Sequence, residues 1–267
     1  MMLKEKLTLV INSCDKFSDL WQTHFDLLNE NWSDRKIETL LVTDCYTSAK
    51  FDGIRIVSAG EGKEYPQRMA TVLPSIRTEY VLITLDDYFP IHKIKNSHIE
   101  RLIRIMDEEG LDYIRLFSDP NSRKPFKKYG KMYEIPLDVN YAVNLYQSIW
   151  RKSFVEKTLR DVQEKTIWNY EVSLTPIARA LGARCVLSKG GEFEILDVIR
   201  KGKILHKANR WLRKNNRTLH QREVISYKEE LRIKIFSVGK KVLPKKLAIA
   251  VKNRLRKKGF VFFSDAV

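Results

Sequence analysis

The stretch "LITLDDYFP" (residues 82–90) decides the fold, because it ends a buried strand on two carboxylates. The residues from Tyr80 to Leu85 are apolar or neutral and predict a strand inside the protein. Asp86 and Asp87 follow without a break, and charges at the end of a buried run are costly unless they have partners. Two adjacent acids alone favour a solvated acidic turn or a helix cap, so a ligand site needs support from the rest of the chain.

Apolar periodicity predicts strands and helices in alternation around this stretch. Strands are expected at 6–12, 37–44, 53–60, 80–87 and 111–117, with helices between them at 18–32, 65–76 and 96–110. After residue 118 we expect a polar loop, strand-like pieces, helices at 151–165 and 169–182, and late strands at 183–188 and 193–199. This order predicts an α/β fold with a mainly parallel sheet flanked by helices on both faces.

The motifs that the chain lacks narrow its function. No Gly-x-Gly-x-x-Gly follows the first strand, no Gly-Lys-Ser/Thr loop is present, and no Gly-x-Ser-x-Gly is present. A classical dinucleotide fold, a P-loop and a hydrolase elbow are therefore unsupported. Cys14, Cys45 and Cys185 are not clustered, so they predict neither a disulfide framework nor a zinc site, and they suit a reducing cytoplasmic setting.

The net charge of +16 is concentrated near the C-terminus. Residues 201–267 contain 20 Lys and Arg against four Asp and Glu, so residues 1–200 are neutral overall. We therefore expect two domains, a catalytic domain at 1–205 and a basic helical extension at 206–267. Such asymmetry indicates a polyanionic partner, either an anionic membrane surface or a nucleic acid.

The segment "VLPKKLAIAVKNRLRKKGFVFF" (242–263) supports the membrane alternative. Leucine or valine recurs every four residues from Leu243 to Leu255, and three phenylalanines follow a glycine. This pattern predicts an interfacial helix, through which 240–267 binds the inner face of the plasma membrane. The alternative is a helix that packs on the protein body and exposes a solvated basic face.

The position of Asp86 and Asp87 suits a metal and diphosphate site. In open α/β sheets, ligands bind beyond the carboxyl ends of the strands, which is where this pair lies. One carboxylate can hold a hard cation such as Mg²⁺ or Mn²⁺, and the other can take a ribose hydroxyl or a metal-bound water. A metal there would bridge a diphosphate and neutralise the charge of a departing nucleotide.

Three short segments together resemble the GT-A glycosyltransferases, most closely the bacterial enzymes that build capsules and lipopolysaccharide. They are "YVLITLDDYF" (80–89), "LYQSIWRKSF" (145–154) and "TIWNYEVSL" (166–174), and the resemblance covers roughly residues 5–205. It implies a nucleotide-sugar donor, with a UDP-sugar favoured, a surface polysaccharide or lipid-linked glycan as acceptor, and inversion at the anomeric carbon. The family's acids usually stand two apart, so the adjacent pair here leaves open which of them holds metal.

The resemblance also implies roles for other residues. Glu171 is the candidate general base, and we expect a helix N-terminus to lower its pKa and keep it ionised. Arg151 is expected to meet the donor diphosphate, and Arg68 to lie near the nucleotide. For Glu171 the ordinary alternative is a first-turn glutamate that only stabilises the helix dipole, and for Arg151 it is a charged helix start.

Residues that end the first two strands are expected to contact the nucleotide. Asn12 begins "NSCD" (12–15) and could touch the base or ribose, and Asp44 corresponds to an acid that often binds the base in the family. Both residues could instead be ordinary turn residues. His206 corresponds to a late histidine that completes the metal shell, although a lone histidine is more often structural.

Two competing functions remain open from the sequence. A neutral α/β body with a basic arm could bind DNA or RNA, although no recognition motif is present and nucleic acid is not the partner we expect. A nucleotidyltransferase could use the same sheet and acids, but it normally has a Gly/Arg-rich loop where this chain has "INSCDKF". The glycosyltransferase hypothesis accounts for more of the pattern.

Overall fold

The computed structural model describes residues 2–118, 121–160, 166–231 and 253–254. The chain divides into two compact units, Met1–Asp197 and Val198–Val267. The sequence placed the domain boundary at 205/206, eight residues later, and that boundary stays a prediction.

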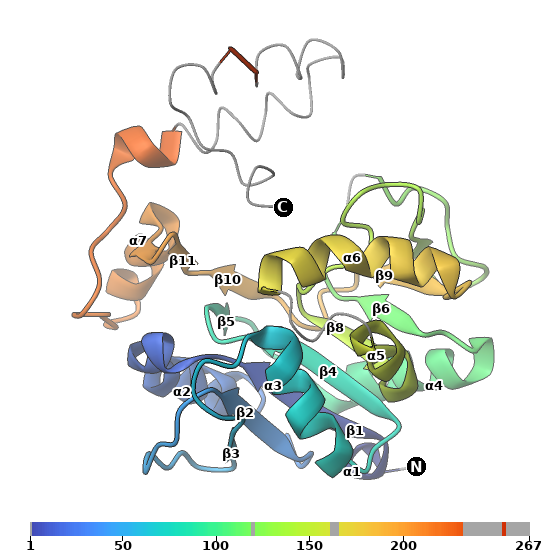
Figure 1. Cartoon of the computed structure of the whole chain (residues 1–267), viewed down its shortest axis with the longest axis horizontal. Coiled ribbons are helices and arrows are strands. Elements are labelled where there is room, and N and C mark those ends of the chain that lie inside the picture. Colours follow the sequence, from blue (N-terminus) through green and yellow to red (C-terminus); the bar gives the residue numbers. More distant parts are fainter. Residues whose placement is uncertain (1, 119–120, 161–165, 232–252, 255–267) are drawn as a thin grey trace. The chain divides into compact units, whose positions relative to one another are not determined.

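The first unit is built on a mixed sheet of eight strands in the order β3-β2-β1-β4-β8-β6-β9-β7 within the described residues (Figure 1). The strands are β1 (Leu7–Asn12), β2 (Thr39–Thr43), β3 (Arg55–Ser58), β4 (Tyr80–Leu85), β6 (Tyr113–Arg115), β7 (Met132–Glu134), β8 (Ser148–Arg151) and β9 (Cys185–Ser188). Neighbours are parallel from β3 through β4 and again between β6 and β9, whereas β8 and β7 are antiparallel to theirs. The predicted α/β class with a mainly parallel sheet is confirmed.

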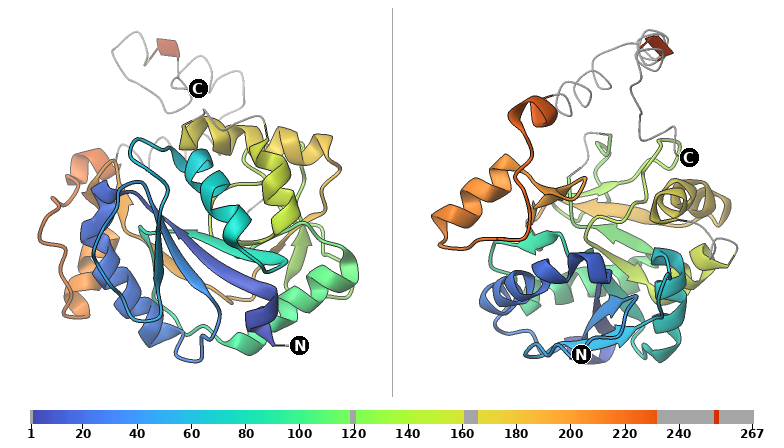
Figure 2. Two further views of the ribbon diagram at one scale, coloured as in Figure 1. Left: turned by 60° about the horizontal axis from the view of Figure 1, so that its bottom comes forward. Right: turned by 60° about the vertical axis from the view of Figure 1, so that its left-hand side comes forward.

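Helices cover both faces of this sheet (Figures 1 and 2). They are α1 (Leu3–Lys6), η1 (Asp15–Phe17), α2 (Ser18–Asn31), α3 (Tyr65–Val72), η2 (Leu73–Ser75), α4 (Asn96–Glu109), α5 (Lys152–Leu159) and α6 (Ile167–Ala180). Along β1, Leu9 and Ile11 belong to the core with α2 and α4, while Val10 belongs to the core with α3, α5 and α6. Successive strand residues point to opposite faces, so an uninterrupted apolar run fills two cores.

The antiparallel strand β8 is the main departure from the expected order. It lies between β4 and β6, and Ser148 pairs with Ile83 on one side and Arg115 on the other. The sequence predicted only strand-like pieces here, because the pairing partners of β8 are far away in the chain. As β8 runs against β4, its first residues lie at the edge of the sheet where β4 ends.

A short second sheet extends the end of β4. β5 (Tyr88–Pro90) follows the two aspartates, and it pairs antiparallel with β10 (Ile195–Asp197) so that Tyr88 lies opposite Asp197. The pairing draws the end of the first unit's chain toward the Asp86–Asp87 turn.

The second unit begins with a hairpin of β11 (Ile199–Arg200) and β12 (Lys203–Ile204), followed by α7 (His206–Lys214). Lys201 and Gly202 both have positive φ, as a two-residue hairpin turn of this kind requires. Within the described residues, no helix combines the length and the apolar character needed to cross a bilayer. The predicted membrane-binding segment, 240–267, lies outside the described residues except for 253 and 254.

A buried histidine on α2 fixes the turn between β4 and β5. His24 is 1% exposed, and its ring lies edge-on to the rings of Phe25 and Phe89, at centroid distances of 5.5 and 5.8 Å. Its Nδ1 donates to the backbone oxygen of Asp86 at 2.9 Å. Burial lowers the pKa of His24 from 6.5 to about 4, so the ring is neutral at physiological pH.

We predict that His24 makes the protein less stable in mild acid. Between about pH 6.5 and 4 the unfolded chain binds a proton that folded His24 does not, so stability falls as the pH falls through this window. From pH 7 to pH 5 this linkage should remove about 2 kcal/mol of unfolding free energy. Urea unfolding at both pH values measures it.

A matched pair of variants isolates the effect of His24. His24→Gln keeps a donor for the Asp86 carbonyl but does not titrate, so its stability should change less between the two pH values. His98→Gln replaces an exposed histidine on α4 and should follow the wild type. Equal pH dependence in wild type and His24→Gln would contradict the assignment.

Candidate functional site at the carboxyl edge of the sheet

The carboxyl ends of β1, β2 and β4 meet at one edge of the sheet. Asn12, the last residue of β1, pairs with Val42 of β2 and with Leu85 of β4. The residues that follow are also tied together, since the Ser13 N–H donates to Val42 O at 2.8 Å and the Asp86 N–H donates to Asn12 O at 3.3 Å. This is the edge at which open α/β sheets bind ligands.

Asp86 is held at its carboxylate and its backbone oxygen as well as at its backbone N–H. Its carboxylate accepts a short hydrogen bond from the Ser13 hydroxyl, and that hydroxyl oxygen in turn accepts from Trp21 Nε1 at 2.7 Å. Its backbone oxygen accepts from His24, as described above. Because Asp86 is only 6% exposed, these hydrogen bonds fix the conformation of the turn.

Arg68 reaches the same edge from α3. Its Nε donates to Asn12 Oδ1 at 3.2 Å, and its Nη1 donates to the backbone oxygen of Lys63. A capping box between Glu64 and Gln67 starts α3 and so sets where Arg68 falls. The Asn12 amide nitrogen is buried without a hydrogen-bond partner among the described residues, so it is a donor that a ligand could use.

Asp44 follows β2 at the same edge and is ionised. Its Oδ1 accepts from the Asp15 N–H at 2.7 Å and from the Thr43 hydroxyl at 3.2 Å. Partial burial works to raise the pKa of Asp44, but the backbone N–H groups of Asp15, Asp44 and Cys45 outweigh it and lower the pKa. The structure therefore gathers Asn12, Asp44, Arg68 and Asp86, which the sequence predicted as nucleotide contacts.

The thiol of Cys14 lies among these residues and is unreactive. Burial raises the pKa of Cys14 to about 11, and the charge of Asp86 adds to the rise. A thiol that stays protonated is a poor nucleophile, so cysteine catalysis does not fit this edge.

The charges of three carboxylates act on the hydroxyl of Tyr88. Burial raises the pKa of Tyr88 well above its ordinary value, and Tyr146 and the charges of Asp87, Asp197 and Glu171 add to the rise. Asp87 is half-buried in the turn, whereas its neighbour is buried. The candidate base and the second aspartate of the pair thus lie within electrostatic reach of one side chain.

Glu171 lies on α6, but not where the sequence placed it. The helix starts at Ile167 after the cap Thr166, so Glu171 is its fifth residue and lies beyond the first turn. Its Oε1 accepts from the Leu145 N–H at 3.1 Å. Burial raises the pKa of Glu171, which corrects the expectation that the helix N-terminus lowers it, because the dipole acts mainly within the first turn.

The structure does not bring Arg151 to this edge. It ends β8 and pairs with Tyr80, the first residue of β4, so it lies at the opposite edge of the sheet from Asp86. Its guanidinium forms an ion pair with Glu79 and donates to the backbone oxygen of Leu111. The reversed direction of β8 explains this placement, and we leave Arg151 out of the proposed site.

His206 begins α7 in the second unit. Its ring stacks on Tyr227 with centroids 3.7 Å apart, and its backbone N–H donates to Glu230 at 3.3 Å. Its role as a metal ligand stays a prediction.

The side chains at the edge fit a cation that arrives with its substrate. No group of three or more His, Cys, Asp and Glu within the described residues could hold a metal by itself. Mg²⁺ and similar hard cations are commonly held by one or two carboxylates plus substrate phosphates and water. Asp86 and Asp87 supply carboxylates of that kind, with Asp86 already bonded to Ser13.

A row of aromatic rings at this edge was not predicted. Tyr88 stacks on Tyr146 with centroids 5.3 Å apart, and Tyr146 stacks on Phe117 at 4.7 Å. The signal in the sequence was weak, since each ring follows or precedes a different strand. Only the long-range pairing of β8 brings them together.

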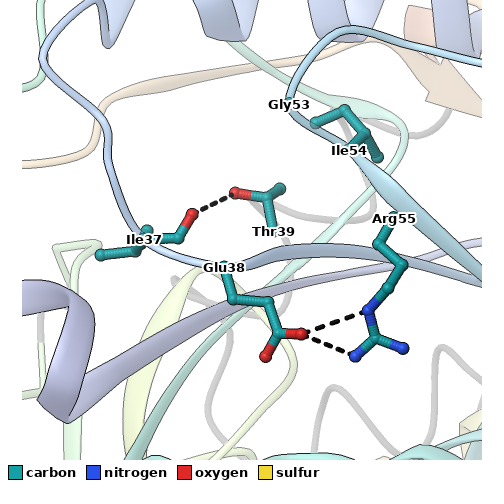
Figure 3. A pocket seen from close by; sticks show the side chains of 6 residues that line it. All are labelled: Ile37, Glu38, Thr39, Gly53, Ile54 and Arg55. Atoms are coloured by element: carbon teal, nitrogen blue, oxygen red, sulfur yellow. Dashed lines mark hydrogen bonds and ion pairs between the residues drawn. The ribbon is translucent and has the colours of Figure 1, made fainter.

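A shallow hollow of about 400 Å³ lies at the other edge of the sheet (Figure 3). Its lining residues come from the starts of β2 and β3, and Figure 3 shows the Glu38 carboxylate facing the Arg55 guanidinium, 2.7 Å apart. Both side chains are about half exposed and pair with each other. The hollow lacks the convergent polar groups of the carboxyl edge, so we do not assign the site there.

Comparison of the sequence with protein-family models finds no match, and comparison with the curated proteins finds none either. The structure is similar to that of S. aureus TarS 1–349 in complex with UDP-GlcNAc, with a TM-score of 0.51 and 16% identity. That match covers 74% of this chain and 60% of TarS 1–349.

The structure is also similar to the mannosyltransferase PcManGT from Pyrobaculum calidifontis in complex with GDP-Man and Mn²⁺. Here the TM-score is 0.50 and the identity 12%, over 79% of this chain and 60% of that enzyme. The matched part of this chain thus spans less than two thirds of either protein. At these identities the likeness establishes the architecture, and the chain has a GT-A-like α/β fold.

Proposed function

We propose that the chain is a glycosyltransferase of the GT-A type, which moves a sugar from a nucleotide-sugar donor to a glycan acceptor. One observation carries the proposal. The carboxyl edge gathers Asn12, Asp44 and Arg68 beside Asp86, while Tyr88 lies within reach of the charges of both Asp87 and Glu171. Nucleotide-binding groups and a candidate base therefore share one edge of one sheet.

The ends of β1 and β2, together with helix α3, supply the nucleotide contacts in this proposal. Asp44 is an ionised acceptor for base or ribose groups, and the unpartnered amide of Asn12 is a donor. Arg68 is a buried cation suited to a phosphate oxygen. Both structural neighbours named above were solved with a nucleotide sugar, and a UDP-sugar is the donor that we favour here.

Asp87 is the carboxylate that we propose for the metal. Asp86 is buried and bonded to Ser13, whereas Asp87 is half-buried beside it. A bound Mg²⁺ or Mn²⁺ would neutralise the charge that develops on the leaving diphosphate. One of the structural neighbours was solved with Mn²⁺.

Glu171 is the proposed general base. An acceptor hydroxyl must lose a proton as its oxygen attacks the anomeric carbon, and attack from the face opposite the diphosphate inverts that carbon. Burial raises the pKa of Glu171, which makes its ionised form a stronger base than that of an exposed glutamate. The Leu145 N–H holds one carboxylate oxygen, so the other can face the acceptor.

The basic C-terminal region belongs to the same proposal. Residues 201–267 carry the whole net charge of +16, and an anionic membrane surface would attract them. Attachment at the cytoplasmic face of the plasma membrane would suit a lipid-linked glycan as the acceptor.

Asp87→Asn is predicted to remove metal-dependent donor binding. The substitution keeps the size of the side chain but removes the charge that a divalent cation requires. Calorimetry against UDP-sugars and GDP-mannose, with and without Mn²⁺, should show that Mn²⁺ strengthens binding to the wild type. The variant should bind at least about tenfold more weakly in Mn²⁺.

Asp52→Asn is the control for this experiment, because Asp52 is an exposed acid next to the hollow at the other edge. It should bind the donor as the wild type does. If no nucleotide sugar binds the wild type, the proposed function fails. If Mn²⁺ still strengthens binding to Asp87→Asn, the metal assignment fails.

Glu171→Gln is predicted to slow sugar transfer by about a hundredfold or more while donor binding persists. Glutamine can still accept the Leu145 N–H, so the fold should be retained. Wild-type activity should fall in acid at a higher pH than an ordinary glutamate would give, because its pKa is raised and the base must be ionised. The assay measures the release of the nucleoside diphosphate in the presence of a panel of oligosaccharide acceptors.

Glu156→Gln is the matched control, since Glu156 is a partly exposed glutamate on α5 that pairs with Lys152. Its activity and pH profile should match those of the wild type. Undiminished transfer by Glu171→Gln would exclude Glu171 as the base.

A further inference from the structure

The stacked rings of Tyr88, Tyr146 and Phe117 lead away from the acidic turn along the carboxyl edge. Both stacks are nearly parallel, with interplanar angles of 9° and 7°. Tyr146 is therefore covered on both faces by its neighbours. Phe117 ends the row and is 41% exposed, so much of this residue is open to solvent.

The sheet fixes this row. Ser148 pairs with Ile83 of β4 and with Arg115 of β6, so Tyr146, two residues earlier, lies level with the last residue of β4 and beyond the end of β6. Phe117 lies two residues beyond Arg115 on the same side. The register of the strands, and not the conformation of a loop, places the rings of Tyr146 and Phe117 against each other.

The row passes the candidate base. The backbone N–H of Leu145 binds Glu171, and Tyr146 is the next residue along the chain. At the inner end, Tyr88 directly follows Asp87. A molecule lying against Phe117 would therefore have the base to one side and the donor region beyond it.

Two more exposed rings lie near Glu171. Trp168 precedes it by three residues on α6, which places both on one side of the helix, and Trp168 is 46% exposed. Tyr141 is 40% exposed, and the charge of Glu171 acts on its hydroxyl. In the described part of the first unit, Tyr46 is the one strongly exposed aromatic residue outside this group.

Exposed aromatic rings that gather beside carboxylates suit a carbohydrate. The faces of a pyranose ring carry C–H groups that gain dispersion and hydrophobic contact on an aromatic ring, while its rim of hydroxyls donates to carboxylates. The charge of Glu171, which acts on Tyr141 and lies on the same helix as Trp168, disfavours an anionic ligand here. A group of exposed aromatic side chains on a protein surface indicates a binding site.

We propose that Phe117, Tyr141 and Trp168 form the acceptor subsite, which takes an uncharged sugar ring and stacks it on Phe117 with a hydroxyl toward Glu171. The inference rests on the proposed function, because it assigns the second substrate of the same site. It identifies the acceptor as a glycan with an accessible pyranose face.

A printed array of neutral and acidic oligosaccharides tests the subsite, with the full-length protein labelled and saturated with UDP and Mn²⁺. The wild type should bind neutral glycans, and Phe117→Ala should bind them at least about tenfold more weakly. Phe117→Tyr keeps the ring and should bind as the wild type does. Leu181→Ala, at an exposed apolar residue after α6, controls for the loss of surface area and should also bind normally.

Nucleotide-sugar calorimetry on the same variants separates the two proposals. Donor binding without any glycan binding, or equal glycan binding by Phe117→Ala and wild type, overturns the acceptor subsite and leaves the donor site standing. Preferential binding of acidic glycans also overturns it. If the wild type binds no nucleotide sugar, the proposed function is overturned instead.

Discussion

The hydrogen bond from Ser13 to Asp86 is the interaction on which the site depends. It joins the end of β1 to the turn after β4, and Trp21 and His24 of α2 hold its two partners. A buried carboxylate without such donors would be costly, so the network both stabilises the turn and fixes its direction. Because Asp86 is fixed in this way, the chain leaves the turn in one defined direction. The positions of Asp87 and Tyr88 are therefore set, and so is the start of the aromatic row.

The antiparallel strand β8 is the second constraint, and it acts on both edges of the sheet. Its first residues bring Tyr146 to the carboxyl edge, where the aromatic row and the backbone donor for Glu171 arise. Its last residue, Arg151, is carried to the opposite edge and pairs with Glu79. One reversal of strand direction thus brings the aromatic row and the backbone donor for Glu171 to the site, and it takes Arg151 away from it.

These two constraints explain what the sequence could predict. Apolar runs located β1, β2 and β4, and the rule for open sheets then placed Asn12, Asp44 and Asp86 at one edge. Periodicity does not report which strands pair, so the place of β8, the row of rings and the position of Arg151 were out of reach. The prediction that the pKa of Glu171 is lowered was wrong for a related reason. Its burial depends on tertiary packing, whereas the helix dipole can be inferred from the local sequence.

The adjacency of the two aspartates now has a physical account. Asp86 is buried and bonded to Ser13, while Asp87 is half-buried and acts electrostatically on Tyr88. A carboxylate that both anchored the turn and held a cation would have to give up one set of bonds for the other. In the proposed site the two tasks fall to neighbouring residues, which avoids that conflict, since the bond from Ser13 to Asp86 can persist whether or not a substrate is bound. A pair spaced two apart would place its second acid at Tyr88, where the aromatic row begins, so adjacency also keeps that row intact.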